Sequence, residues 1–176
     1  MARYRADALV MPLAEFGAVA RETGWDPAAL AARFEVALPA VFRRIATLPE
    51  REMAGVRAGI VICDGAGAVT FCKPLDGFAP PRHGAGCPLW PLYQALGRPM
   101  APLRAVLLPA GRVQQRLLAY AVSEAHQAEG FGSALVHESS MLLLSGGPSA
   151  VGADPPQSVG MTCRICPRAD CPARRE

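Results

Sequence analysis

The sequence has no long apolar segment among its 176 residues. Its longest apolar runs, such as Ala58–Cys63 and Met141–Leu144, are far shorter than the roughly 20 residues that cross a bilayer. The N-terminus carries Arg3 and Arg5 but lacks the apolar stretch and small-residue cleavage site of a secretory signal. These absences predict a cytoplasmic protein without a membrane partner, in which thiols stay reduced.

Histidine is scarce, and the motifs of several enzyme classes are missing. The sequence has three scattered histidines and no H-E-x-x-H pair, which excludes a zinc-peptidase centre of that type. It also contains no flavin signature, no nucleotide-binding glycine loop and no second cluster motif. Asp64–Gly67 has glycines, but its flanking strand patterns make it a hairpin turn. We therefore expect a protein that is not an enzyme.

The sequence also has little excess of charge of either sign. Lysine and arginine together number 18 against 15 aspartates and glutamates, so the net charge is only +3 and does not by itself indicate nucleic-acid binding. Hydrophobic residues make up 51% of the chain, which is enough to form the core of one domain with a small appendage.

The first fifty residues have the apolar spacing of helices. A helical pattern runs over Ala6–Arg21, with Pro12 as a predicted kink or break. Asp26 is placed to cap a helix over Pro27–Phe34, whose first residue is proline. A third helix is expected over Leu38–Leu48.

The pattern changes to that of strands after residue 56. The predicted strands are Ala58–Cys63, Val69–Lys73, Leu103–Leu108, Arg112–Val122 and Ala134–Leu144, the last with a bulge or end at Ser139-Ser140. A short helix is predicted over Pro88–Leu96 and a linker over Ser145–Ser158. The fold class is therefore α+β, with N-terminal helices, an antiparallel sheet of about five strands and a cysteine-rich C-terminal tail. The corresponding regions are 1–50, 51–144 and 145–176.

Three of the six cysteines lie in a C-x2-C-x4-C run at the C-terminus: Cys163, Cys166 and Cys171. No helix or strand period places three cysteines on one face at these spacings, whereas a chain wrapped around an ion or cluster does. The best candidate for a fourth ligand is Cys87, because the glycines before it allow a close approach of the backbone. Its alternative role is that of a small buried apolar residue. Core packing is the expected role of Cys63 and Cys72.

Four thiolates fit either a tetrahedral zinc ion or an iron–sulfur cluster. Structural zinc usually binds paired C-x2-C knuckles. Here three cysteines lie on one side and one on the other, which is closer to ferredoxin-type ligation, and Pro167 and Pro172 follow two of the thiols as in C-P endings. The spacing favours iron–sulfur but leaves zinc open.

The two cysteine motifs resemble a known family. Gly86–Trp90, Val159–Cys166 and Arg168–Pro172 are similar to the C-terminal sensory domain of bacterial short-chain fatty acyl-CoA regulators, which are XRE-type transcriptional regulators of propionate and related metabolism. The segment Ala6–Leu48 is similar to the end of the metallopeptidase-like middle domain of that family. One stretch, Glu129–Ala134, departs from the family's usual Gly-Cys-Asp motif.

The resemblance implies a 4Fe–4S cluster held by Cys87, Cys163, Cys166 and Cys171. It also implies that DNA is a partner only through a helix-turn-helix domain that this chain lacks, and that the protein self-associates. An acyl-CoA ligand is a further implication, for which Arg82, Arg116 and Tyr120 are the candidate contacts. Arg116 and Tyr120 are expected to share one strand face, because they lie four residues apart within the strand predicted over 112–122.

These features predict a regulatory domain in which a cluster links the C-terminal tail to the Cys87 loop. Without the cluster, the linker over Ser145–Ser158 is expected to leave the tail mobile, so that ligation converts redox state into order of a segment. The alternatives are a structural zinc module and an acyl-CoA-binding module without a cluster.

Overall fold

Helices occupy the first part of the chain in the computed structural model, which describes residues 2–81, 84–111, 115–127, 132–146 and 154–174. They are α1 (Ala2–Val10), α2 (Leu13–Glu22), α3 (Pro27–Phe34) and α4 (Leu38–Ala46), followed by the 3-10 turn η1 (Glu50–Glu52). The predicted break at Pro12 is confirmed, because α1 ends before it and α2 begins after it. Proline cannot donate the backbone N–H that a continuous helix needs there.

Helix α3 has the predicted bounds, and its cap explains them. The Asp26 carboxylate accepts a hydrogen bond from the backbone N–H of Ala28 at 2.8 Å, which satisfies one of the free donors at the start of the helix. The helix ends where Glu35 adopts a left-handed conformation with φ of 52°.

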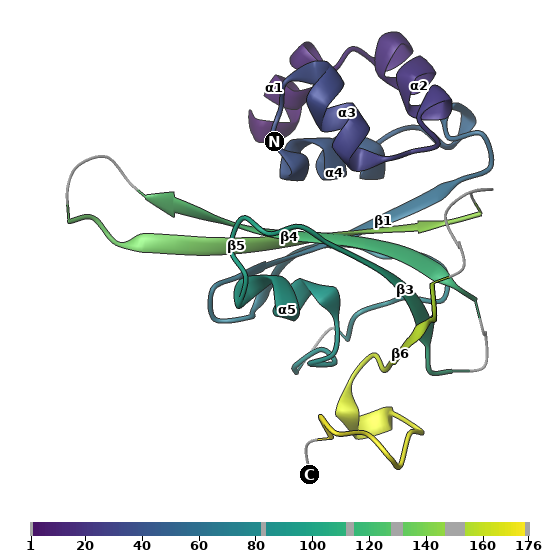
Figure 1. The fold of residues 1–176 in the computed structure, drawn as a ribbon, viewed down its shortest axis with the longest axis vertical. Helices are drawn as coiled ribbons and strands as arrows, with labels where there is room; N and C mark the ends of the chain where they lie inside the picture. Colours follow the sequence, from purple (N-terminus) through teal and green to yellow (C-terminus); the bar gives the residue numbers. More distant parts are fainter. Residues whose placement is uncertain (1, 82–83, 112–114, 128–131, 147–153, 175–176) are drawn as a thin grey trace.

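Within the described residues, one sheet of six strands follows, in the order β2-β1-β5-β4-β3-β6 (Figure 1). The strands are β1 (Arg57–Asp64), β2 (Val69–Lys73), β3 (Leu103–Pro109), β4 (Leu117–Gln127), β5 (Leu135–Ser145) and β6 (Gln157–Val159), and the short helix α5 (Pro91–Leu96) precedes β3. All strand pairs are antiparallel except β3 and β6, which run parallel. The α+β class is confirmed, and the sheet is mixed because β6 joins its edge.

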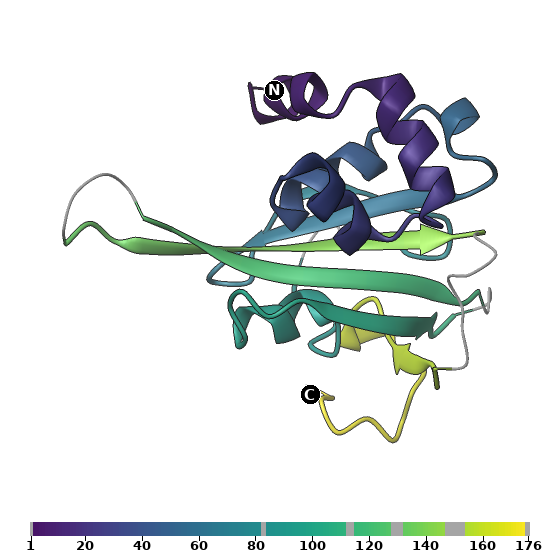
Figure 2. The same cartoon turned by 45° about the horizontal axis from the view of Figure 1, so that its top comes forward.

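The sheet separates two apolar layers. Helices α1 to α4 cover one face, where Ile60, Leu118 and Leu142 pack against helical residues such as Phe42 (Figures 1 and 2). Helix α5 lies on the opposite face, in a second apolar cluster that contains Trp90. Side chains alternate between the faces of a strand, so each central strand contributes to both layers.

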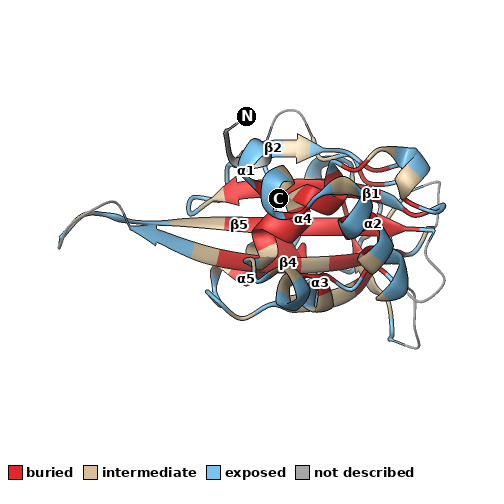
Figure 3. Cartoon of the chain, turned by 90° about the horizontal axis from the view of Figure 1, so that it is seen from above, coloured by how far each residue is buried: buried red, intermediate tan, exposed pale blue. Residues whose placement is uncertain are grey.

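The ends of β4 and β5 extend past the rest of the sheet as a two-stranded ribbon (Figures 1 and 3). Burial falls along both strands toward the connection between them, as the change from red to pale blue in Figure 3 shows. The described part of the chain contains no helix long and apolar enough to span a membrane.

Three expected elements differ from the structure. Strand β4 begins at Leu117, while its predicted start at Arg112 lies outside the described residues. The strand continues to Gln127, because its ladder with β5 extends to the pair Gln127 and Leu135. The expected bulge or end at Ser139-Ser140 is wrong, since both serines lie within the continuous β5 pairings. The third difference is β6, which falls in the segment predicted to be a linker.

Candidate metal centre

The loop before α5 holds Cys87 in the second apolar layer. Cys87 is only 5% exposed, and its carbonyl accepts a hydrogen bond from the backbone N–H of Trp90 at 3.1 Å. The Trp90 ring is fully buried between Phe78, 4.9 Å away by ring centroids, and Tyr93, at 5.8 Å in a stacked arrangement. A Cβ on Gly86 would come within 2.4 Å of the Trp90 ring, so this loop conformation requires glycine beside Cys87.

The C-terminal segment reaches this loop by joining the edge of the sheet. Strand β6 pairs with β3, and the backbone N–H of Ala110 donates to the Val159 carbonyl at 2.7 Å. The next two carbonyls, of Gly160 and Met161, accept hydrogen bonds from Trp90 Nε1 at 2.8 Å and from the Cys87 N–H at 3.0 Å. Residues 157–161 are therefore held by backbone contacts with the sheet and the Cys87 loop, and the mobility of the tail without a cluster stays a prediction.

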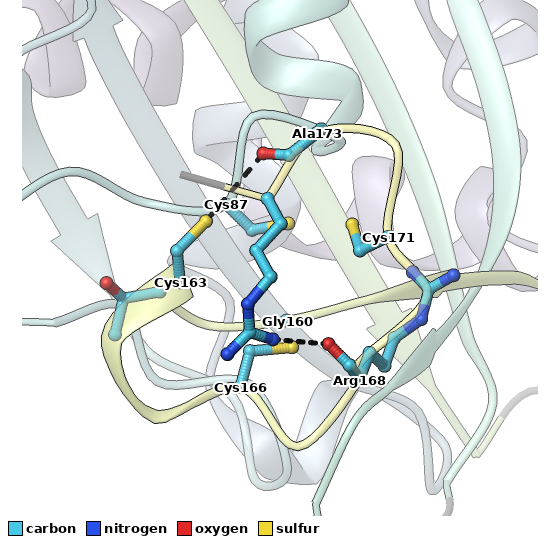
Figure 4. A pocket seen from close by; sticks show the side chains of 9 residues that line it. Cys87, Gly160, Cys163, Cys166, Arg168, Cys171 and Ala173 are labelled. Carbon is cyan, nitrogen blue, oxygen red and sulfur yellow. Dashed lines mark hydrogen bonds between the residues drawn. The ribbon is translucent and has the colours of Figure 1, made fainter. Parts of the chain in front are cut away.

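The four cysteines of the predicted ligand set line a single hollow (Figure 4). Cys163 begins the 3-10 turn η2 (Cys163–Ile165), and the Cys166 N–H donates to the Cys163 carbonyl at 3.3 Å, which turns both side chains toward the same space. Cys171 enters the hollow from the following loop. The remaining lining residues are Gly160, Thr162, Arg168, Ala173 and Arg174. All four thiols are free of disulfides.

The backbone at Gly160 fits closely under one of these thiols. A Cβ at Gly160 would lie 2.9 Å from the Cys166 Sγ and 3.3 Å from its Cβ, so the sulfur occupies the space that a larger residue would fill. The hollow thus has a donor set made entirely of sulfur, with a glycine floor that lets the thiol approach the backbone. Such a set suits thiophilic metals and iron–sulfur clusters.

Among the described residues, no group of three or more His, Cys, Asp or Glu side chains is placed to hold one metal ion. A single zinc ion would need its ligand sulfurs at about 2.3 Å, and therefore close to one another.

Two arginines in the hollow wall have defined partners. Arg168 Nη1 donates to the Ser158 carbonyl at 2.7 Å, and Arg174 Nη1 donates to the Arg168 carbonyl at 2.5 Å. Arg164, in the same segment, is exposed. The site therefore combines four neutral or anionic sulfurs with cationic side chains.

The other two cysteines lie outside the hollow. Cys63 is fully buried on β1, and its burial, together with the nearby carboxylate of Asp64, raises the pKa of the thiol to about 11. Burial also raises the pKa of the Cys72 thiol on β2. Both belong to the apolar layer around α5, as predicted from their positions in the first hairpin.

Of the three candidate acyl-CoA contacts, the structure describes Arg116 and Tyr120. Arg82 lies outside the described residues, and Arg116 is an exposed residue before the start of β4 rather than a member of its face. Tyr120 packs on the helical side of the sheet, opposite to the Cys87 layer. Burial raises the pKa of its phenol, and a hydrogen bond to Arg104 opposes this effect.

The residues that join the two halves of the site were not identified from the sequence. Trp90 and Gly160 lie 70 residues apart and meet through one buried hydrogen bond. Both stand within the cysteine motifs, which was the available signal, but spacing alone gives no partner for an indole N–H. Lining roles of Thr162 and Ala173 were likewise missed.

Sequence comparison shows that this chain is similar to known transcriptional regulators. Residues 47–176 match the family described as "Short-chain fatty acyl coenzyme A regulator, C-terminal". The HTH-type transcriptional regulator RamB of Mycobacterium tuberculosis is 32% identical over 188 aligned positions, which cover 99% of this chain and 39% of RamB. The propionyl-CoA carboxylase regulator of Cereibacter sphaeroides is 31% identical over 183 positions, covering 99% of this chain and 39% of that protein.

A solved structure has the same fold. A Mycobacterium tuberculosis transcriptional regulator superimposes with a TM-score of 0.77 at 24% sequence identity, over 98% of this chain and 56% of the other. The chain spans about two fifths of the length of the curated relatives that it matches, or 39% of RamB. By the match over residues 47–176, the protein belongs to the short-chain fatty acyl coenzyme A regulator family, in the part that forms the C-terminal domain.

Proposed function

We propose that this chain is the sensory domain of a transcriptional regulator of short-chain acyl metabolism, and that Cys87, Cys163, Cys166 and Cys171 bind an iron–sulfur cluster of the 4Fe–4S type. The convergence of these four thiols on one hollow is the observation that supports the cluster. The metabolic role rests on the family match and on the name of the Cereibacter relative, which regulates propionyl-CoA carboxylase.

The spacing of the four cysteines along the chain favours a cluster over a zinc ion. Cubane clusters distribute four cysteine ligands over four iron atoms, whereas one zinc ion draws all four sulfurs to itself. Three of the thiols lie in one short segment and the fourth lies in a distant loop, a distribution closer to ferredoxin-type ligation than to paired zinc knuckles. The bound cluster would supply a redox-active and iron-dependent centre.

The protein residues have separate roles in such a site. Cys163, Cys166 and Cys171 would hold the cluster from the C-terminal segment, and Cys87 from the loop before α5. Trp90 and the Cys87 N–H fix the spacing between these two parts through their bonds to Gly160 and Met161. Loss of the cluster would free mainly residues 162–174, since β6 and its bonds do not depend on it. The regulated surface is thus a short segment beside a fixed sheet edge.

Anaerobic purification of the chain from iron-replete cells tests the cluster. We expect brown protein with iron and sulfide in equal amounts, and Cys166→Ser should lose both. Cys72→Ser, which changes a half-buried thiol outside the hollow, serves as the matched control and should retain them. Colourless protein with one zinc per chain, or protein without metal, would reject the proposal.

A further inference from the structure

Arg168 connects the thiol-bearing segment to the sheet. It lies between Cys166 and Cys171, and its Nη1 donates to the carbonyl of Ser158, which is paired with Leu108 at the edge of the sheet. The side chain is half-buried in the hollow wall, where Figure 4 shows it beside the thiols. Because the donor is charged, this bond is stronger than a neutral one.

Arg174 closes the loop that carries the last thiol. Its Nη1 donates to the Arg168 carbonyl at 2.5 Å, and its backbone N–H donates to the Cys171 carbonyl at 3.0 Å. A weaker contact adds to this closure, since the Cys163 thiol donates a hydrogen bond to the Ala173 carbonyl at an S···O distance of 3.9 Å (Figure 4). The Arg168 guanidinium therefore links its segment to β6, and the Arg174 guanidinium links residue 174 to residue 168.

We propose that Arg168 and Arg174 are positioning residues that hold Cys163, Cys166 and Cys171 around the hollow before any cofactor binds. These two hydrogen bonds consist of protein atoms alone, so they need no metal or cluster to form. Their use for cluster assembly rests on the proposed function, but the positioning itself does not. A segment arranged in advance loses less conformational freedom when its ligand binds.

Arg164 shows that an arginine in this segment need not have such a role. It stands between Cys163 and Cys166 and is exposed, and among the described residues its side chain makes no hydrogen bond. Arg164 and Arg168 thus have the same chemistry, at positions four residues apart, with different attachments. A different effect of substituting Arg168 and Arg164 would therefore come from the hydrogen bond of Arg168 to Ser158, and not from the loss of a positive charge.

The same guanidinium groups bear on the charge of a loaded site. Four thiolates and a cluster carry net negative charge, and the reduction potential of a cluster depends on nearby charge and hydrogen bonds. Removal of the Arg168 or Arg174 charge from the hollow wall favours the less negative, oxidised state. The potential should therefore become more negative in either variant.

Amide hydrogen exchange of the reduced, metal-free chain tests the positioning. In Arg168→Gln, we expect exchange over residues 161–174 to rise about tenfold, the effect of losing one charge-assisted hydrogen bond. Arg174→Gln should show the increase mainly over residues 168–174, and Arg164→Gln should match the unchanged protein. Urea unfolding of each variant verifies that the sheet remains folded. Exchange in Arg168→Gln and Arg174→Gln equal to that in Arg164→Gln would overturn the proposal.

Alkylation and electrochemistry separate this proposal from the cluster itself. Iodoacetamide should react about tenfold faster with the terminal thiols of metal-free Arg168→Gln than with those of Arg164→Gln. If the unchanged protein never binds a cluster, the proposed function fails, while hydrogen exchange and alkylation of the metal-free chain still decide the positioning. If it does bind one, the midpoint potential should be lower in Arg168→Gln than in Arg164→Gln, and equal potentials would reject the electrostatic part.

Discussion

The backbone N–H of Cys87 donates a hydrogen bond to the carbonyl of Met161, two residues before Cys163, at 3.0 Å. This bond and the neighbouring one from Trp90 to Gly160 bring a mid-chain loop against the C-terminal segment. Both are made by backbone or indole groups, so the two halves of the thiol site meet without a contribution from the thiols.

Trp90→Phe should weaken this junction. The substitution removes the Nε1 donor and leaves the buried Gly160 carbonyl unpaired, which costs about 2 kcal/mol of unfolding free energy. Urea denaturation measures this cost, and alkylation of Cys163 in the native state should become faster. Trp25→Phe, in the helical layer, also replaces a buried indole by a phenyl ring and should leave the alkylation rate of Cys163 unchanged. Equal alkylation rates of Cys163 in the two variants would show that the hydrogen bond from Trp90 to Gly160 does not hold the two segments together.

Gly160→Ala should displace Cys166. The new Cβ would stand 2.9 Å from the sulfur, so the side chain or the backbone has to shift, at a cost of about 1–3 kcal/mol. We expect a lower iron content in anaerobically purified protein and little change in the helical layer. Gly111→Ala is a suitable control, because no atom lies within 4 Å of its added Cβ. Equal iron in both variants would show that the thiol tolerates the shift.

Cys63 should make the protein less stable at alkaline pH. Its pKa is raised from 9.0 to about 11 in the fold, so the unfolded chain loses this proton at a lower pH than the native chain. The unfolded state then binds fewer protons between pH 9 and 11, and the free energy of unfolding falls as pH rises through that window. Urea titrations at pH 8, 9, 10 and 11 measure the slope. Cys63→Ala should reduce it, and an unchanged slope would assign the effect to other groups.

Asp7→Asn should loosen the contact between α1 and α4. The carboxylate of Asp7, largely buried, accepts bonds from Arg43 Nε at 2.9 Å and Nη2 at 3.4 Å. Loss of this charge leaves a partly buried guanidinium without its counter-charge, and we expect about 2 kcal/mol of destabilisation in urea.

The exposed pair of Glu15 and Arg33 provides the comparison for that variant. Its side chains are 50% and 59% exposed, so Glu15→Gln should cost less than about 0.5 kcal/mol. Similar losses for the two variants would mean that burial does not strengthen the Asp7 pair.

Local chemistry allowed much of the fold to be predicted. Pro12 and Asp26 act through the backbone of their own helices, so their effects are visible in a few residues. Strand β6 was missed because its three residues have no pattern of their own, and the edge of β3 supplies their pairing. The far part of β4 was missed for a similar reason, since Ser123–Gln127 is largely polar and is held by β5.

The same difference between local signals and contacts of distant segments applies to the site. Three thiols in one short run are evident from spacing, whereas the position of Cys87 opposite them depends on contacts between distant segments. The structure places all four around one hollow, and their ligation stays a prediction. The tethers of Arg168 and Arg174 end on carbonyl groups, which every residue has, so no sequence pattern marks them.

The single sheet separates two apolar cores. Phe42 and its neighbours pack on the face covered by α1 to α4, and Trp90 and its neighbours pack on the face covered by α5. Substitutions on the helical side can therefore accumulate while the sulfur-bearing side keeps its packing. The two faces of the sheet can thus change in evolution independently of each other.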